Sequence, residues 1–217
     1  MLFKHFKDRE DAAEKLAKQL LDYRNKSPVV LAIPRGGVVV AYEVAKELNA
    51  PLDLIIPRKI GAPSDPELAI GAVTEDGTTI INQQLVTILG VSTEYVELEK
   101  KRQIQEIKRR VSLYRGDAVP QSLEGKTVII VDDGIATGFT MKAAIHSVRK
   151  QKPSSIVVAV PVGPPDTVEE MKKEVDKVIC LITHEPFFAI GQFYSDFGQV
   201  SDEKVIQLMK LSRKISA

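Results

Sequence analysis

Apolar positions along the chain alternate between helical spacing and short continuous runs. Five runs have the length of buried strands, at residues 29–33, 52–56, 127–131, 156–160 and 178–181. Helical spacing occupies the intervals between and around them, at residues 8–23, 38–48, 141–150, 166–174 and 201–211. Strand, crossover helix and strand in this order predict an α/β fold with a mostly parallel central sheet.

Two segments depart from this alternation. Residues 69–82 predict a β-hairpin that turns at Glu75-Asp76-Gly77, because Asp-Gly supplies the positive φ angles of a tight turn. Residues 93–114 predict a long, highly charged helix with one narrow apolar stripe, at Ile104, Ile107, Val111 and Tyr114. A solvated helix is the favoured interpretation, and a contact surface for another subunit is the alternative.

Composition narrows the class of protein. A chain of 217 residues with 44% hydrophobic content can bury a substantial core and predicts one domain. The 30 basic and 29 acidic residues nearly cancel, which argues against nucleic acid as a partner. The single cysteine, Cys180, lies in an apolar run and predicts a buried strand thiol in a reducing compartment. No apolar stretch reaches the roughly 20 residues of a membrane span, so we expect no membrane partner and a cytoplasmic protein.

The most informative stretch of the chain is residues 127–140. Five strand-like residues end in Asp132 and Asp133, and a short loop with two glycines and two threonines then leads into a helix. Backbone amides at such a loop bind phosphate, while carboxylates bind hydroxyl groups and metal ions. A ribose 5-phosphate satisfies both halves. The alternative is an ordinary strand-to-helix connection with a capping threonine.

This stretch resembles the phosphoribosyl-diphosphate signature of type I phosphoribosyltransferases, a hydrophobic strand followed by Asp-Asp-x-x-x-Thr-Gly-x-Thr. The match includes both acids together with Thr137, Gly138 and Thr140. The resemblance implies the type I phosphoribosyltransferase fold in a single domain, residues 1–217. Its core would be about residues 29–183, with a long helical insertion at 93–115 and a small hood that includes about residues 184–200.

The resemblance also implies a reaction. Ribose 5-phosphate would pass from phosphoribosyl diphosphate to a nitrogenous base, and pyrophosphate would leave with the help of Mg²⁺. The 5-phosphate would bind at five consecutive residues, Ala136, Thr137, Gly138, Phe139 and Thr140. Asp132 and Asp133 would be catalytic, because they would hold the ribose diol and stabilise positive charge on the sugar.

A second glycine-bearing turn follows the first strand, at Pro34-Arg35-Gly36-Gly37. Its glycines allow the backbone to approach an anion, and Arg35 could add a forked donor. In the resembling family this position is the pyrophosphate loop, with a cis peptide bond expected at Pro34–Arg35. Lys59, at the end of the next strand, would be a catalytic cation at the pyrophosphate, and residues 61–79 would form a mobile loop over the site.

Five of the twelve aromatic residues fall between residues 187 and 197. A small aromatic core is the favoured interpretation for Phe193 and Phe197. The segment also resembles the hood of hypoxanthine-guanine transferases, which implies that Phe188 stacks on a purine and that Ala189 offers backbone hydrogen bonds. Asp196 would then bind the metal ion, with Asp132 contributing through ribose hydroxyls or water.

Two departures from that purine-specific pattern leave the acceptor base open. One extra residue separates Gly191 from Asp196, and Ala136 stands where those enzymes place an aspartate before the Thr-Gly pair. A non-catalytic protein that senses phosphoribosyl diphosphate is therefore an alternative function. A structural module that docks through the helix at 93–114 is a weaker one, and a homodimer is a further alternative for the quaternary state.

Overall fold

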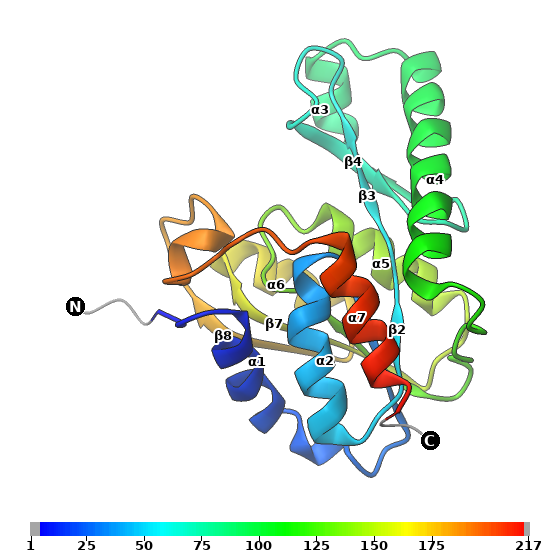
Figure 1. Ribbon diagram of the computed structural model, residues 1–217. Coiled ribbons are helices and arrows are strands. Elements are labelled where there is room, and N and C mark those ends of the chain that lie inside the picture. The colour runs from blue at the N-terminus through cyan, green and yellow to red at the C-terminus, as the bar shows by residue number, and fades with distance from the viewer. Residues whose placement is uncertain (1–4, 215–217) are drawn as a thin grey trace.

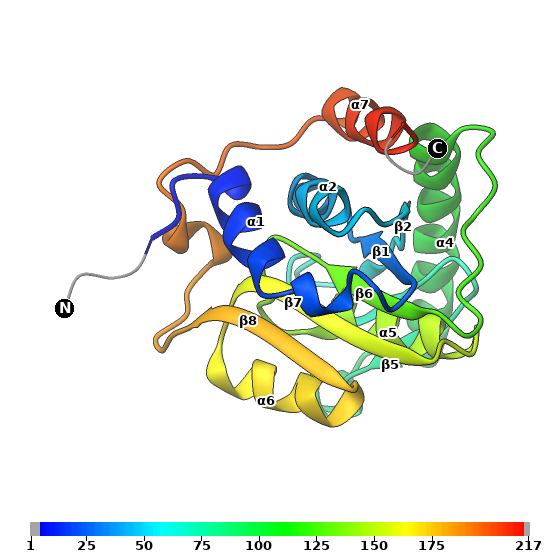
Figure 2. The same ribbon diagram turned by 90° about the horizontal axis from the view of Figure 1, so that it is seen from below.

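The structure of the protein is a computed structural model that describes residues 5–214. Its centre is a parallel five-stranded sheet in the order β2-β1-β6-β7-β8 (Figure 2). The strands of this sheet are β1 Pro28–Ala32, β2 Leu52–Leu54, β6 Thr127–Val131, β7 Ser155–Gly163 and β8 Lys177–Thr183. All residues of β1, β2 and β6 are buried, as expected of parallel strands covered on both faces.

Helices cover the two faces of this sheet (Figure 2). One face packs against α1 Arg9–Lys18, α2 Gly36–Leu48 and α7 Asp202–Ser212, and the other against α5 Phe139–Arg149 and α6 Pro165–Glu174. A short 3₁₀ helix, Leu21–Tyr23, follows α1. Successive residues of β6 serve opposite sides, because Ile129 belongs to the core beneath α2 and Ile130 to the core beneath α5.

A second unit of structure projects from the core as an arm (Figure 1). It consists of an antiparallel sheet, β3 Arg58–Gly61, β4 Ala69–Val73 and β5 Thr79–Ile81, with α3 Gln83–Ile88 and α4 Thr93–Arg115. At the base of the arm, Nε of Arg115 donates to Oδ1 of Asp53 at 3.0 Å. Because both side chains are largely buried, this ion pair fastens the end of α4 to β2.

Most predicted elements are confirmed, including the hairpin and the helix at residues 201–211, where Oγ of Ser201 accepts from the Lys204 amide at 3.2 Å. Several boundaries were wrong. Helices α2 and α5 each begin two residues earlier than expected, and α6 follows Pro164 and begins at Pro165 rather than Asp166. The turn-rich segment after Pro57 contains strand β3, and α3 was not expected.

The connections of the central sheet create a crevice. Strand β1 leads through α2 to β2 on one side, whereas β6 leads through α5 to β7 on the other. Since β1 and β6 are neighbours, with Ala32 beside Val131, the chain leaves their carboxyl ends in opposite directions. Ligands of open α/β sheets bind at such a point.

The hood segment, residues 184–200, is hydrogen-bonded to the residues just before α1. The Ser195 amide donates to the Phe6 carbonyl and the Phe6 amide to the Phe193 carbonyl, both at 2.8 Å. Phe193, within the 3₁₀ helix η2 Ile190–Phe193, is 1% exposed, which confirms the predicted aromatic core there.

Cys180 lies in β8, as the sequence predicts, but it is half-buried rather than fully buried. Burial raises the pKa of its thiol to about 12. Across residues 5–214, no helix combines the length and apolar character needed to cross a membrane.

Candidate functional site

The acid pair lies directly after β6, at the mouth of the crevice. Asp133 is buried and Asp132 is half-buried. Oδ1 of Asp132 accepts from the Asp133 amide at 2.8 Å, which fixes the turn that follows the strand. Burial raises the pKa of Asp132 well above its ordinary value, and the neighbouring Asp133 carboxylate raises it further.

The first glycine turn packs against this acid pair. A Cβ on Gly36 would lie 1.8 Å from Oδ2 of Asp133, and a Cβ on Gly37 would lie 2.8 Å from Oδ1 of Asp132. Only glycine therefore permits the observed approach at either position. The peptide bond between Pro34 and Arg35 is cis, as predicted. The two loops that the sequence separates by about a hundred residues form one surface.

The second loop has the geometry of an anion site at the start of α5. Ala136 and Thr137 are exposed, and Gly138 adopts a left-handed conformation with φ 76° before the helix begins at Phe139. The loop is fastened from α6, because the Thr167 hydroxyl donates to the Ala136 carbonyl at 2.8 Å. The first amides of a helix have no intrahelical acceptor, so those of Phe139 and Thr140 can bind an anion.

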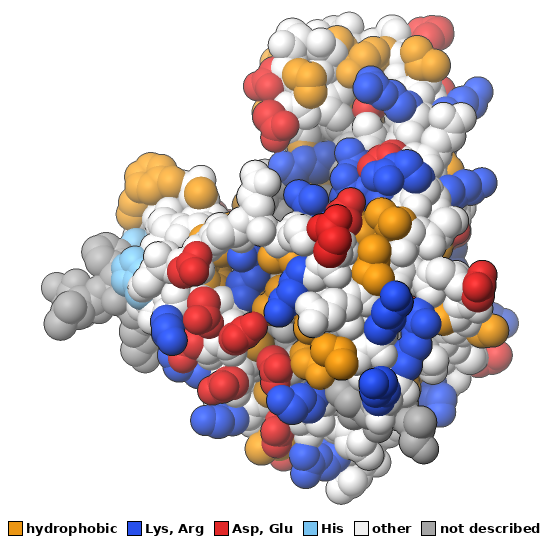
Figure 3. Space-filling model, viewed as in Figure 1, with side chains coloured by type: hydrophobic (Ala, Val, Ile, Leu, Met, Phe, Trp, Pro, Cys, Tyr) orange, Lys and Arg blue, Asp and Glu red, His pale blue; other side chains and the backbone are white. Residues whose placement is uncertain are grey.

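A cleft of about 460 Å³ joins both loops to the arm. Pro34 and Thr140 line it from the two loops, and Glu67 lines it from the segment between β3 and β4. Its cationic side chains come from β3 and α4, at Arg58, Lys59, Arg102 and Arg110. Lys and Arg side chains gather where the arm meets the core (Figure 3). The cleft is therefore suited to anions, with exposed Lys59 on its wall.

Arg35 points away from the glycine turn toward the start of α7. Its Nη1 lies 3.4 Å from Oδ1 of Asp202, which also accepts from the Tyr114 hydroxyl at 2.6 Å. Burial is the main cause that raises the pKa of Tyr114 to about 12, with the Asp202 bond next. The structure therefore does not place the 40% exposed Arg35 side chain at the glycine turn, where the sequence predicted a donor.

The hood segment presents an exposed ring. Phe188 is 83% exposed, while the amides of Phe188 and Ala189 both donate to Oε1 of Gln192, at 2.9 and 3.2 Å. Asp196 is exposed, and its Oδ1 accepts from the Gly198 amide at 3.1 Å. The phenyl ring is thus available for stacking, whereas the Ala189 amide already has a partner.

A family model identifies the chain. The model is that of the phosphoribosyl transferase domain, and it matches residues 3–197. The chain belongs to the phosphoribosyl transferase family. The central parallel sheet, its flanking helices and the small antiparallel sheet constitute the type I phosphoribosyltransferase fold expected from the sequence.

Individual relatives agree with this assignment. The Mycobacterium tuberculosis proteins MT0597 and Rv0571c, provisionally named phosphoribosyl transferases, are 44% identical over 208 residues, or 95% of this chain. The match spans 46% of each of those proteins, so the chain has about half the length of these curated relatives. The solved structure of TT1426 from Thermus thermophilus superimposes with a TM-score of 0.79 at 40% identity, and covers 94% of this chain and 97% of its own.

One residue that faces the phosphoribosyl transferase acid pair was missed from the sequence. Nε of Arg9, on α1, donates to Oδ2 of Asp133 at 2.7 Å. A charged residue on an amphipathic helix resembles any other solvated side chain, so the sequence pattern contained no signal for this contact. The Tyr194 hydroxyl, also unpredicted, donates to the Asp133 carbonyl at 2.6 Å.

The protein supplies few ligands for a metal ion. Within the described range, 5–214, no three His, Cys, Asp or Glu side chains gather in a metal-binding cluster. Mg²⁺ is commonly held by one or two carboxylates together with water and substrate phosphates, rather than by a cage of protein ligands. The half-buried Asp132 carboxylate therefore fits a metal ion that arrives with a phosphorylated ligand.

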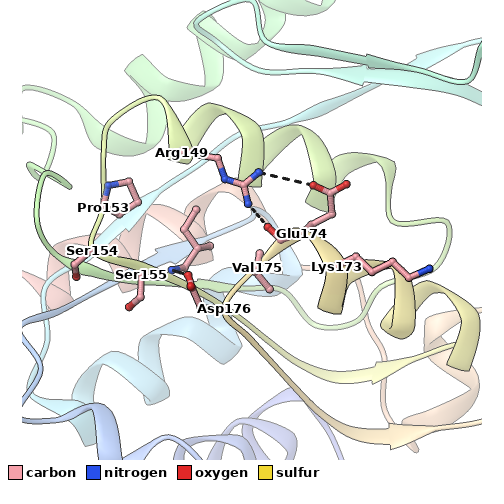
Figure 4. A pocket seen from close by; sticks show the side chains of 9 residues that line it. Arg149, Pro153, Ser154, Ser155, Lys173, Glu174, Val175 and Asp176 are labelled. Carbon is pink, nitrogen blue, oxygen red and sulfur yellow. Dashed lines mark hydrogen bonds and ion pairs between the residues drawn. The ribbon is translucent and has the colours of Figure 1, made fainter.

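A different cavity, shown in Figure 4, has no part in this site. It has a volume of about 360 Å³ and lies between the end of α5, the end of α6 and the start of β7. The Arg149 guanidinium bonds to the Glu174 carbonyl there, and Oδ2 of Asp176 accepts from the Ile156 amide at 2.8 Å. These groups already have partners, and they lie at the opposite end of the strands from the acid pair.

Proposed function

We propose that the protein transfers ribose 5-phosphate from phosphoribosyl diphosphate to a nitrogenous base and releases pyrophosphate, with a purine-like base favoured over a pyrimidine. The direct approach of Gly36 to the Asp133 carboxylate is the main support, because it joins an anion-binding turn to a diol-binding acid pair. A ribose that is phosphorylated at both ends needs an anion-binding turn and a diol-binding acid pair close enough for one molecule to contact both.

Each end of the donor has candidate partners. Residues 136–140 would bind the 5-phosphate through the amides at the start of α5 and the hydroxyls of Thr137 and Thr140. Asp132 and Asp133 would bind the ribose diol and stabilise positive charge that develops on the sugar. At the other end, the pyrophosphate would lie against Gly36 and Gly37, with Lys59 and a repositioned Arg35 as cationic donors.

A divalent ion would complete this arrangement. Asp132 would hold Mg²⁺, directly or through ribose hydroxyls and water, and Asp196 would approach it from the hood segment. The bound ion would neutralise the charge of the departing pyrophosphate. The protein's own part would be to orient the sugar and to exclude water. Strand β4 occupies the middle of the predicted loop 61–79, so only the segment between β3 and β4, which already lines the cleft at Glu67, would cover the donor.

The hood segment supports a purine-like acceptor. Its exposed Phe188 ring offers a flat apolar face on which a bicyclic base can stack. Ala136 leaves the position beside Thr137 without an acid, so a proton on the base would pass to solvent or to a group of the acceptor itself. This feature also motivates the alternative of a non-catalytic sensor of phosphoribosyl diphosphate.

A panel of nucleobases with phosphoribosyl diphosphate and Mg²⁺, scored for pyrophosphate release, tests the proposal. Release with one base, most rapidly with a purine, is the expected result. Tight donor binding without turnover on any base would instead support the alternative of a non-catalytic sensor.

Asp133→Asn should reduce kcat/KM by at least about a hundredfold while the protein stays folded. Near-wild-type transfer by this variant, under conditions where chemistry limits the rate, would exclude the proposed role of Asp133.

A further inference from the structure

We infer that Arg9 is a positioning residue of the ribose site, which fixes the Asp133 carboxylate against Gly36 and links it to the hood segment. The inference rests on the proposed function, because it assigns Arg9 a task in binding the same donor. Arg9 is far from the signature loop in sequence and belongs to neither of the two glycine turns.

The Arg9 guanidinium makes three different contacts at once. Nε donates to Oδ2 of Asp133 at 2.7 Å, and Nη1 donates to the Gly198 carbonyl at 2.8 Å. The plane of the group lies over the Phe197 ring, with Cζ 3.8 Å from the ring centroid. A planar, forked and permanently charged side chain can satisfy all three, whereas the single ammonium of lysine cannot.

The position of this ion pair places it inside the site. The Arg9 and Asp133 side chains are each 12% exposed. A Cβ on Gly36 would meet both Oδ2 of Asp133, at 1.8 Å, and Nε of Arg9, at 2.9 Å. The pyrophosphate turn therefore contacts the paired side chains directly, and a change in Arg9 must alter the surface that the donor meets.

Asp133 is held at its backbone as well. The buried Tyr194 hydroxyl donates to the Asp133 carbonyl at 2.6 Å, from the segment that follows η2. Helix α1 thus fixes the side chain of Asp133, and the hood segment fixes its main chain. With Oδ2 committed to Arg9, the ribose diol is left with Asp132 and the remaining oxygen of Asp133.

Three variants test the inference in the full chain. Arg9→Ala removes every contact, and Arg9→Lys keeps the charge but loses the fork. Arg24→Ala is the matched control, because Arg24 bonds to the Glu47 carbonyl and carboxylate, which lie at the far end of α2 from the glycine turn. Two readouts are needed. Calorimetry follows phosphoribosyl-diphosphate affinity with Mg²⁺, and thermal melts without ligand follow the stability of each variant.

For Arg9→Ala, we expect donor affinity at pH 7 to fall by about tenfold to a hundredfold. Arg9→Lys should melt close to wild type, yet still bind the donor several-fold more weakly, because lysine keeps the charge but not the planar fork. Arg24→Ala should match wild type in donor affinity.

An unchanged donor affinity in folded Arg9→Ala would overturn the role of Arg9. Should Arg9→Ala fail to fold, wild-type affinity in Arg9→Lys would overturn it as well, because that variant cannot preserve the fork. Failure of the wild-type protein to bind phosphoribosyl diphosphate would instead overturn the proposed function. Measuring donor binding by the wild-type protein first separates these two failures.

Discussion

Gly36 and Asp133 touch across the crevice between β1 and β6. A Cβ at position 36 would lie 1.8 Å from Oδ2 and 2.7 Å from Cγ of Asp133, closer than any side chain can approach. The backbone of the turn after β1 and the carboxylate after β6 are therefore in direct contact. The proposed anion-binding and diol-binding parts of the site meet at this contact.

Gly36→Ala should separate these parts. Because the new methyl group must displace the Asp133 carboxylate, we expect phosphoribosyl-diphosphate affinity, measured by calorimetry, to fall by at least about tenfold. Gly125→Ala is the control, since Gly125 has a positive φ of 68° and open space around it, in a turn before β6 at the opposite edge of the sheet. That variant should lose about 1 kcal/mol of stability and no affinity. Equal donor binding by Gly36→Ala and wild type would contradict the assignment.

Asp132→Asn should stabilise the protein while it weakens donor binding. Burial and the Asp133 charge raise the pKa of Asp132, so the folded state holds this proton more tightly than the unfolded chain. The stability due to this proton is present below the ordinary aspartate pKa of about 4 and is lost as pH rises through the raised value. At pH 7 the free energy of unfolding of Asp132→Asn should therefore be about 1 kcal/mol higher than that of wild type.

Urea denaturation across pH 4 to 8 measures the effect on both proteins. The wild type should lose stability relative to Asp132→Asn as the pH increases, and the two curves should converge at the acid end. Parallel curves would show that Asp132 ionises as freely in the folded protein as in the unfolded chain.

Lys59→Ala should weaken binding of the pyrophosphate end of the donor. Lys59 is exposed on the wall of the cleft beside both loops, so its loss removes a cation without disturbing the core. We expect inhibition by pyrophosphate to be about tenfold weaker in this variant. Its pyrophosphate affinity should also depend less on salt concentration than that of wild type. Lys46→Ala, in the last turn of α2 and paired with Glu43, is the matched control and should bind like wild type. A pyrophosphate affinity that Lys59→Ala leaves unaltered would exclude this contact.

Asp76→Ala should destabilise the hairpin of the arm. Its carboxylate accepts from the hydroxyls of Thr74 and Thr78, at 2.5 and 2.6 Å, and from Nζ of Lys150 at 3.3 Å. Burial alone would raise the pKa of Asp76, but these bonds outweigh it and the net pKa is lowered. Loss of the bonds should cost about 1–2 kcal/mol at pH 7.

The pH dependence of this cost has a definite sign. Because the folded pKa of Asp76 is below its unfolded value, its contribution is present above about pH 4 and is lost as the pH falls through the folded value. Thermal melts of Asp76→Ala should thus approach those of wild type in strong acid. Glu75→Ala, an exposed neighbour in the same turn, should leave stability within about 0.5 kcal/mol of wild type.

The central fold could be predicted because its signal is local. Strands such as Thr127–Val131 are continuous apolar runs, and α2 and α5 show helical spacing directly after them. Parallel strands ending in glycine turns were also enough to place both loops at one sheet edge. The cis peptide at Pro34–Arg35 followed from the family resemblance rather than from any pattern of hydrophobicity.

The remaining features depend on contacts that sequence patterns do not record. Strand β3 has two charged residues followed by Ile60 and Gly61, and forms because it pairs with β4 beneath α4. Helix α3 has six residues and buries none of them fully, so it is too short to show helical spacing in the sequence. Arg9 becomes part of the site only when α1 packs beside the crevice, which no local rule specifies.

The fastening of Phe6 to Phe193 and Ser195 has a consequence for biosynthesis. A ribosome releases the signature loop well before the residues that cover it, so a nascent chain that ends near α5 has its acid pair and lacks its partners from the hood segment. Until residues 193–198 emerge, Arg9 has no aromatic ring to stack on and Phe6 has no strand partner. The proposed sugar site is thus completed late in synthesis, when the two distant segments meet.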